Sequence, residues 1–411
     1  MSPLACRFCS QPLAESFVDL GVSPLANAYL SAAACEQPET FYPLHVLRCT
    51  HCHLVQLPAV ESPETIFREY AYFSSMSESW LAHAEAFAAA VTARFGLDAR
   101  HRVVEVASND GYLLRCFARR SIPVLGIEPA RNVAAAAEKI GVPTVVEFFG
   151  SELAERLLAE RGPADLLVAN NVLAHTPDLN DFVDGLTRLL AATGVLTLEF
   201  PHLVELVENN QFDTIYHEHF SYFSMLSVRA VLAAHGLEIF DVEQLPTHGG
   251  SLRIFAQHAD SATRAVAPRV ATLEARERDA GYHTAAPYRG FAGRVRAIRR
   301  HLLRFLIEQA DAGRTVAGYG APAKGNTLLN YCGVRRDLLA FTVDRSPHKQ
   351  GRFLPGTRIP ILAPEALRAQ PPDHVLILPW NLRQEIRGQL ADLDARGTRF
   401  LVAIPDLTEL A

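Results

Sequence analysis

Apolar and polar residues between positions 100 and 200 repeat a pattern of strand followed by helix. Continuous apolar runs occur at residues 102–107, 124–127, 144–149, 166–168 and 195–200. Segments with helical spacing of apolar residues separate them, at residues 112–120, 132–140, 151–161 and 179–190. Buried parallel strands have continuous apolar runs and are connected by helices, so this pattern predicts a doubly wound α/β sheet.

The pattern changes on either side of this block. A helix is predicted at residues 79–95 before it, and another at 226–235 after it. Two later strands, at 238–245 and 252–257, would extend the sheet as an antiparallel addition at its edge. Residues 260–310 are rich in Arg, Ala and Glu and predict a solvated helical connector. The apolar positions of that connector are Val295, Ile298, Leu302 and Leu306.

A second alternation of strands and helices begins near residue 315. Its apolar runs lie at residues 315–318, 339–343, 374–378 and 399–404. They predict a smaller, Rossmann-like α/β domain at the carboxyl terminus. Residues 1–75 carry scattered Pro and short apolar runs, too few to build a large core. We therefore expect three domains, at residues 1–75, 76–260 and 261–411, with the helical connector opening the third.

Composition and charge narrow the class of protein. The chain has 411 residues, of which 49% are hydrophobic and 20% charged, as in ordinary globular proteins. A net charge of −6 offers no basic surface to nucleic acid or to an anionic membrane. The amino terminus does not resemble a signal peptide, and no apolar run approaches the roughly 18 residues of a membrane span. We expect a soluble cytoplasmic protein with no nucleic-acid or membrane partner.

Two pairs of cysteines predict a metal site. Cys6 and Cys9 form one CxxC pair, and Cys49 and Cys52 form another. Two such pairs can close a tetrahedral Zn²⁺ site, and four sulfur ligands leave no open coordination position, so the zinc would be structural. The alternative is a set of four buried thiols. A disulfide framework is disfavoured in a cytoplasmic chain.

Residues 213–223 concentrate side chains able to move protons. The segment contains Tyr216, His217, Glu218, His219 and Tyr222, with no Lys or Arg. Two imidazoles that titrate near neutral pH, a carboxylate and phenols can together perform general acid–base chemistry. The alternative is a buried turn in which these polar groups are all hydrogen-bonded.

The first strand of the block leads through a tight loop into a helix. Such a loop presents backbone N–H groups to a ligand, and an acidic residue about 20 positions later suits ribose hydroxyls. Only one of the three glycines of a dinucleotide site is present, which favours S-adenosylmethionine over a dinucleotide. The candidate cofactor residues here are Glu105, Ala107, Asn109, Asp110, Gly111 and Glu128.

Three polar residues follow the fourth strand of the block, at the edge where ligands bind in open α/β folds. Asn170 and Asn171 end an apolar strand, and His175 lies four residues further on. They are candidates for the active site, with Asn170 on the cofactor side. The alternative for the asparagines is a turn or a helix cap.

The carboxyl-terminal domain contains a second glycine-containing loop between a strand and a helix. Close glycines can admit a phosphate, and a lysine adds positive charge. A carboxylate after the next strand suits a ribose. A nucleotide diphosphate is therefore the expected ligand of this domain. Its candidate residues are Gly318, Tyr319, Gly320, Lys324, Asn326, Asp344, Lys349 and Arg352.

Taken in order, the two CxxC pairs, the Asn-Asp-Gly111 loop, the Tyr-His-Glu-His219 cluster and the Gly-Tyr-Gly-Ala-Pro-Ala-Lys-Gly run resemble the sugar C-methyltransferases that act on nucleotide-linked 4-keto deoxysugars. The resemblance covers essentially the whole chain. It implies a zinc-binding amino-terminal domain, a class I methyltransferase sheet, and a Rossmann-like domain for the nucleotide sugar. S-adenosylmethionine is the implied methyl donor, and a dTDP-linked sugar is the expected acceptor.

The resemblance also implies roles for individual residues. The general base falls on His219, and the supporting tyrosine and glutamate fall on Tyr216 and Glu218. Further active-site residues are Asn171, His175, an upstream Tyr70 and, for substrate binding, Tyr222. His217 is secondary, because relatives vary at its position.

These residues fit methylation at carbon, which requires removal of a proton next to a carbonyl group. The hypothesis is that His219 takes the proton from C3, that Glu218 orients His219, and that Tyr216, Asn171 or His175 stabilises the enolate. Three alternatives remain: O- or N-methylation of another small molecule, a zinc-containing dinucleotide dehydrogenase, and a zinc-ribbon module for nucleic acid. The missing glycines disfavour the dehydrogenase, and the negative charge disfavours nucleic acid.

Overall fold

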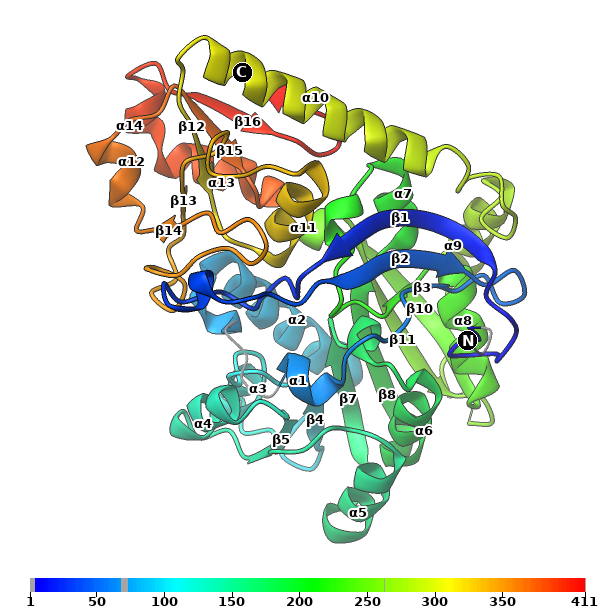
Figure 1. The fold of residues 1–411 in the computed structure, drawn as a ribbon. Coiled ribbons are helices and arrows are strands. Elements are labelled where there is room, and N and C mark those ends of the chain that lie inside the picture. The colour runs from blue at the N-terminus through cyan, green and yellow to red at the C-terminus, as the bar shows by residue number, and fades with distance from the viewer. Residues whose placement is uncertain (1–3, 68–72, 262, 411) are drawn as a thin grey trace.

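A seven-stranded sheet forms the centre of the chain. The structure, a computed structural model, describes residues 4–67, 73–261 and 263–410, which form three sheets (Figure 1). In the central sheet the strand order is β10-β11-β8-β7-β4-β5-β6. Strand β11 pairs in antiparallel fashion with both β10 and β8, and the other pairs are parallel, so the predicted doubly wound sheet with an antiparallel edge is confirmed. The strands are β4 (Val103–Val106), β5 (Val124–Ile127), β6 (Thr144–Val145), β7 (Ala164–Asn170), β8 (Leu190–Pro201), β10 (Leu237–Leu245) and β11 (Ser251–His258).

Helices cover both faces of this sheet because neighbouring residues of its strands point to opposite sides. Val103 belongs to the hydrophobic core formed with Phe87 and Val91, whereas Val104 belongs to the core that contains Leu157 and Leu186. The helices are α2 (Glu78–Phe95), α3 (Leu114–Ala118), α4 (Arg131–Lys139), α5 (Ser151–Arg161), α6 (Leu179–Leu189), α7 (Leu203–Glu208) and α8 (Met225–Ala234). The sheet is therefore buried on both faces, and only its edges and strand ends remain for ligands.

The carboxyl-terminal sheet has six described strands in the order β14-β13-β12-β15-β16-β17, and only β17 is antiparallel. They are β12 (Val316–Tyr319), β13 (Thr342–Val343), β14 (Ile361–Leu362), β15 (His374–Ile377), β16 (Arg399–Val402) and β17 (Thr408–Glu409). The helices of this part are α11 (Ala323–Cys332), α12 (Glu365–Ala369), α13 (Arg383–Gln389) and α14 (Ala391–Asp394). The four predicted strands are present, although β13 is only two residues long.

The amino-terminal sheet joins two distant parts of the sequence. Its order is β1-β2-β3-β9, and the last strand comes from the histidine-rich segment at residues 213–223. Phe17 and Val46 of this sheet share one hydrophobic core with Leu302 and Leu329 of the carboxyl-terminal part. The elements are β1 (Glu15–Ser23), β2 (Tyr42–Arg48), β3 (Val55–Gln56), β9 (Ser221–Tyr222) and α1 (Pro63–Phe67).

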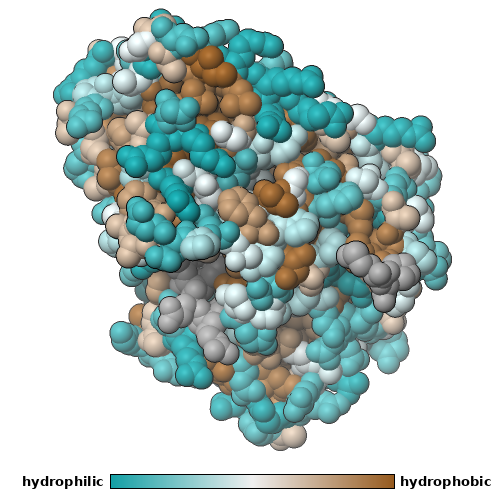
Figure 2. All heavy atoms as spheres, in the orientation of Figure 1, coloured by the Kyte–Doolittle hydropathy of each residue, from teal (hydrophilic) through white to brown (hydrophobic). Residues whose placement is uncertain are grey.

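Two helices fill the predicted connector, α9 (Pro268–Asp279) and α10 (Phe291–Asp311). The four apolar positions predicted for α10 are all buried, while most of its arginines are exposed. Figure 2 shows hydrophilic side chains along the upper edge of the molecule, where α10 runs in Figure 1. No helix in the described ranges combines the length and the apolar character needed to span a bilayer.

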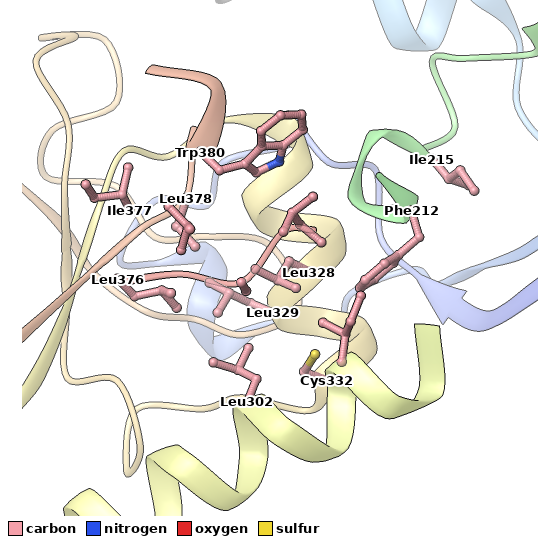
Figure 3. Packing of buried hydrophobic residues seen from close by; sticks show 14 of the residues in the cluster. Phe212, Ile215, Leu302, Leu328, Leu329, Cys332, Leu376, Ile377, Leu378 and Trp380 are labelled. Carbon is pink, nitrogen blue, oxygen red and sulfur yellow. The ribbon is translucent and has the colours of Figure 1, made fainter. Parts of the chain in front are cut away.

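The histidine-rich segment is packed against the carboxyl-terminal domain. Phe212 and Ile215, at either end of the short helix η4 (Phe212–Thr214), lie beside α11 in Figure 3. The hydroxyl of Thr327 in α11 donates a hydrogen bond of 2.9 Å to the carbonyl of Ile215. Any displacement of α11 would therefore move the segment that carries the candidate catalytic groups.

Candidate active site

A single large cavity brings the predicted ligand-binding edges together. It has a volume of about 560 Å³ and includes the carboxyl ends of β4, β5 and β7, where Ala107, Glu128 and Asn171 lie. Lys324 and Lys349 line it from the carboxyl-terminal domain. Cavities at the carboxyl ends of parallel strands and between domains are the usual ligand sites of α/β proteins.

The imidazole of His219 lies in this cavity in a defined tautomer. Its Nδ1 atom is 2.8 Å from the carbonyl oxygen of Thr214. A carbonyl oxygen can only accept, so Nδ1 carries the proton and Nε2 has a free lone pair. Burial lowers the pKa of His219 well below its usual value, and nearby His175, His248 and Lys324 lower it further. The ring is therefore neutral at pH 7 and able to accept a proton.

Other predicted groups surround His219. The ring centroids of Tyr216 and His175 lie 4.0 and 4.7 Å from that of His219, and both residues line the cavity with Asn171. Burial lowers the pKa of His175 to about 4, so this imidazole is also neutral. Tyr222 lies behind His219 in β9, buried outside the cavity lining. Tyr70 lies outside the described residues.

The role predicted for Glu218 is corrected by its contacts. The carboxylate of Glu218 accepts a hydrogen bond of 2.6 Å from Asn27 Nδ2, and the group that orients His219 is the Thr214 carbonyl. Glu218 points toward the amino-terminal domain because the turn at residues 217 and 218 reverses the chain between η4 and β9. His217 lies on the same side, where its Nε2 donates to the carbonyl of Pro43 at 3.1 Å.

Some of the predicted cofactor residues line the cavity, and the others lie beneath it. Ala107, Asn109, Glu128 and Asn170 line the cavity. Glu105, Asp110 and Gly111 lie beneath it. Asn109 and Asp110 accept hydrogen bonds of 2.9 and 3.1 Å from the backbone N–H groups of Ser74 and Ser75, and thereby fix the turn before α2. Gly111 has a φ of +75°, and a Cβ there would lie 3.1 Å from Val142.

The glycines of the carboxyl-terminal loop serve packing, which corrects their predicted role. A Cβ on Gly318 would lie 2.6 Å from Thr342, and one on Gly320 would lie 2.6 Å from Pro379. Gly318 and Gly320 both lie outside the cavity lining. The side-chain N–H of Asn326 donates a hydrogen bond of 2.6 Å to the carbonyl of Ala26 and so connects α11 to the amino-terminal domain.

The other residues predicted to bind the nucleotide either line the cavity or lie outside it. Asp344 accepts from the backbone N–H groups of Ala321 and Ser346, at 2.7 and 2.8 Å. The Tyr319 hydroxyl donates to Gln389 at 3.1 Å. Arg352 is exposed and lies outside the cavity lining.

Lys324 is a half-buried cation that lines the cavity. Its Nζ donates a hydrogen bond of 3.0 Å to Asn381 Oδ1 and lies 4.6 Å from the centroid of the Trp380 ring. The Trp380 indole N–H donates 2.7 Å to Asp213, the first residue of the histidine-rich segment. Burial lowers the pKa of Lys324, and the charge of Asp213 opposes that shift. The positive charge therefore lies close to His219.

Several cavity residues escaped the sequence analysis. Phe148 and Phe149 lie a few residues after β6, within the longer strand predicted at residues 144–149. Trp80 falls in the helix predicted at residues 79–95, and His248 falls between the two strands predicted at 238–245 and 252–257. The residues missed are Asn27, Trp80, Phe148, Phe149, Thr214, His248 and Asn381.

Comparisons with known proteins decide the family. Three family models match in chain order: a zinc-binding domain at residues 6–67, a methyltransferase domain at 80–242, and a C-methyltransferase C-terminal domain at 246–405. Over 404 residues the chain is 40% identical to the C-methyltransferase NovU of Streptomyces niveus, which covers 98% of this chain and 95% of that protein. The chain belongs to this C-methyltransferase family. The methyltransferase uses S-adenosylmethionine as its methyl donor, as the sequence predicted.

Two solved structures align with part of this one. PH0226 from Pyrococcus horikoshii aligns over 47% of this chain and 97% of its own, with 14% identity and a TM-score of 0.38. Magnesium protoporphyrin IX methyltransferase from Synechocystis PCC 6803, with bound S-adenosylmethionine, aligns over 43% and 78%, with 16% identity and a TM-score of 0.33.

The four cysteines of the methyltransferase fit a zinc ion. The Sγ atoms of Cys6, Cys9, Cys49 and Cys52 all lie within 4.8 Å of one another, with two pairs at 3.5 Å. A tetrahedral Zn²⁺ with bonds of about 2.3 Å brings its sulfur ligands to about 3.8 Å from one another. The predicted zinc-binding domain is confirmed, and with four sulfur ligands the metal has no open position for substrate.

The strand ends of the methyltransferase also fit its methyl donor. Asn170 lines the cavity, and its Oδ1 atom is buried and lacks a hydrogen-bond partner among the described residues. Buried polar atoms are normally hydrogen-bonded, so this atom indicates a polar ligand at the β7 end. Glu128 lines the same cavity at the end of β5, where its carboxylate accepts hydrogen bonds of 3.0 and 2.9 Å from the backbone N–H groups of Asn109 and Ala130.

Proposed function

We propose that this methyltransferase removes a proton from a carbon beside the ketone of a nucleotide-linked 4-keto deoxysugar, with C3 as the position, and transfers a methyl group to that carbon. The observation that carries the proposal is the tautomer of His219, which directs a free Nε2 lone pair into a cavity that both α/β domains line. Bound S-adenosylmethionine supplies an electrophilic methyl group.

A general base is needed because a C–H bond next to a ketone is only weakly acidic. His219 meets the requirement, since it is neutral, oriented by Thr214, and enclosed. Removal of the proton leaves an enolate, whose oxygen needs hydrogen-bond donors or positive charge. Tyr216, His175 and the Lys324 ammonium lie in the same cavity and can supply both. O- or N-methylation would not require this set of groups.

The nucleotide of the sugar, proposed as dTDP, would lie against the carboxyl-terminal domain. Lys349 lines the cavity and lies 5.3 Å from the Tyr29 ring. Its ammonium donates 2.9 Å to the Ala321 carbonyl, which fixes a positive charge beside the loop before α11. A fixed cation at the rim suits a diphosphate. Lys324 lines the same cavity as His219 and its charge lowers the pKa of that histidine, so we assign it to the reacting end instead of the phosphate role first predicted.

The product of the reaction tests this proposal. The methyltransferase is incubated with dTDP-4-keto-6-deoxyglucose and S-adenosylmethionine carrying a ¹³C-labelled methyl group, and the product is examined by NMR. Coupling of the labelled carbon to C3 is expected. Coupling to C5, the other carbon beside the ketone, would contradict the assigned position, and a methyl group on oxygen would contradict C-methylation.

We predict that Glu128→Gln weakens binding of S-adenosylmethionine by about 10- to 100-fold, because a charged acceptor of ribose hydroxyls contributes about 1.5–3 kcal/mol. Calorimetric titration with S-adenosylhomocysteine measures the effect. Glu138→Gln, on the exposed side of α4, is the matched control and should bind normally. Equal affinity of the two variants would remove Glu128 from the cofactor site.

The acid limb of the pH–rate profile should lie below pH 6.5. The neutral form of His219 is the active base, and burial together with His175, His248 and Lys324 lowers its pKa. Activity should therefore stay constant from pH 8 to pH 6.5 and fall only in more acidic solution. The profile is measured at saturating methyl donor. An acid limb at or above pH 6.5 would contradict this sheltered environment.

A further inference from the structure

The turn between β10 and β11 places an unassigned histidine in the cavity. His248 has φ 55° and ψ 16°, in the left-handed region that residues other than glycine rarely adopt. It lines the cavity together with His219 and Lys324. A non-glycine residue in this conformation is strained and persists only when its surroundings fix it, and such residues concentrate at functional sites.

The surroundings of this turn account for its conformation. A Cβ on Gly249 would lie 2.3 Å from Trp380, and one on Gly250 would lie 2.5 Å from Glu205. Gln211 Nε2 donates 2.7 Å to the Gly249 carbonyl. The Thr247 hydroxyl donates 3.0 Å to Glu199 at the end of β8. The turn is thus fixed between the central sheet and the carboxyl-terminal domain, and it can present His248 in one direction only.

The ring of His248 packs against Trp80 at an interplanar angle of 57° and lies at the cavity wall. Its centroid lies 5.1 Å from that of Trp80. Neither ring nitrogen has a hydrogen-bond partner among the residues that the structure describes, although the ring is only half-buried and lines the cavity. A strained, aromatic-supported imidazole that faces a ligand cavity indicates contact with the ligand.

The charges around His248 keep it neutral. Burial and the positive charge of Lys324 lower the pKa of His248 to about 4, and His83 lowers it too, whereas the carboxylate of Glu199 opposes the shift. A neutral imidazole carries one N–H donor. Such a donor can stabilise negative charge without competing with His219 for the proton.

We propose that His248 is a catalytic residue whose N–H donates to the ketone oxygen of the sugar as that oxygen becomes an enolate. When His219 Nε2 takes the proton from the carbon, the C–H electron pair forms the C=C bond and the carbonyl π pair moves to the oxygen facing His248. The reacting carbon and the oxygen are separated by one carbon atom, so the base and a donor to the oxygen can come from different elements that line the same cavity. Tyr216 and His175 lie against the base itself, whereas His248 comes from another strand connection. The inference rests on the proposed function.

Substitutions at His248 separate catalysis from folding. His248→Gly relieves the left-handed strain, so its melting temperature should equal or exceed that of the wild type. Its turnover of dTDP-4-keto-6-deoxyglucose should fall about 100-fold or more. His248→Asn tolerates the same backbone and retains an N–H donor, so it should lose less activity than His248→Gly. Added imidazole should partly restore the glycine variant.

The matched control is His83→Gln, which changes a histidine stacked on the same Trp80 ring at 4.9 Å but outside the cavity lining, and it should keep turnover within a few-fold. Exchange of the carbon-bound proton with D₂O, measured with S-adenosylhomocysteine in place of the methyl donor, should fall in parallel with turnover in His248→Gly. Normal exchange in that variant, or a lowered melting temperature that accounts for the lost activity, would overturn the role. Absence of exchange in the wild-type enzyme would instead contradict the proposed function.

Discussion

Replacing His219 by glutamine should lower the rate of methyl transfer by about 10³-fold, within the range that a general base contributes. Glutamine can preserve the hydrogen bond that the ring donates to Thr214 but has no basic nitrogen to accept a proton. Affinity for S-adenosylhomocysteine and for the nucleotide sugar should stay within a few-fold of wild type. Turnover at saturating substrates and calorimetric binding measure the two effects separately.

His217→Gln is the matched control for this variant. The residue lies in the same segment and is buried, but its Nε2 donates to the Pro43 carbonyl outside the cavity. Glutamine can keep that hydrogen bond, so turnover should remain within a few-fold of wild type. Comparable losses in both variants would show that the segment acts by its fold, and near-normal turnover in His219→Gln would remove the residue from the chemistry.

Loss of the zinc should abolish activity even though the metal is not at the active site. Cys49→Ser should lower the metal content below one zinc per chain and reduce turnover by at least about 100-fold, because binding of a structural zinc contributes about 10–16 kcal/mol to folding. Metal analysis, the melting temperature and turnover measure the outcome. Cys35→Ser, in the same part of the chain but outside the four-cysteine cluster, is the control and should be unaffected.

The structural path from zinc to catalysis is short. The side-chain N–H of Gln56 donates 3.1 Å to Cys6 Sγ, and Gln56 pairs with Ser221 across β3 and β9. Ser221 is two residues from His219 in the sequence. The metal therefore fixes the strand that follows the base. Full activity in a zinc-free, folded protein would contradict this dependence.

The period of apolar residues was sufficient to predict the central sheet and the buried face of α10. Long, fully buried strands such as β7 and β8 leave continuous apolar runs, and the helix positions Ile298 and Leu302 follow the helical repeat. Strands of only two residues, such as β3 and β9, leave no such signal. Their paired residues are 165 or more positions apart in the sequence, and the pairing depends on tertiary contacts. The joint amino-terminal sheet could therefore not be predicted.

Only part of the candidate site could be predicted from the sequence. Residue types identified Tyr216 and His219 in one segment, the position after the fourth strand identified His175, and the family resemblance joined the three in one active site. Contacts could not be predicted from type: Glu218 is bonded to Asn27 at 2.6 Å and the glycine at 320 makes room for Pro379. His248 was missed because its significance lies in a left-handed backbone and in packing against Trp80, neither of which a sequence pattern displays.

The most direct test of the central claim is proton exchange at the carbon beside the ketone. Wild-type enzyme and His219→Gln are incubated in D₂O with dTDP-4-keto-6-deoxyglucose and S-adenosylhomocysteine, and deuterium at C3 is followed by NMR. Rapid incorporation by the wild type and a loss of about 10³-fold in the variant are predicted. Equal incorporation by both proteins would contradict the assignment of His219 as the base.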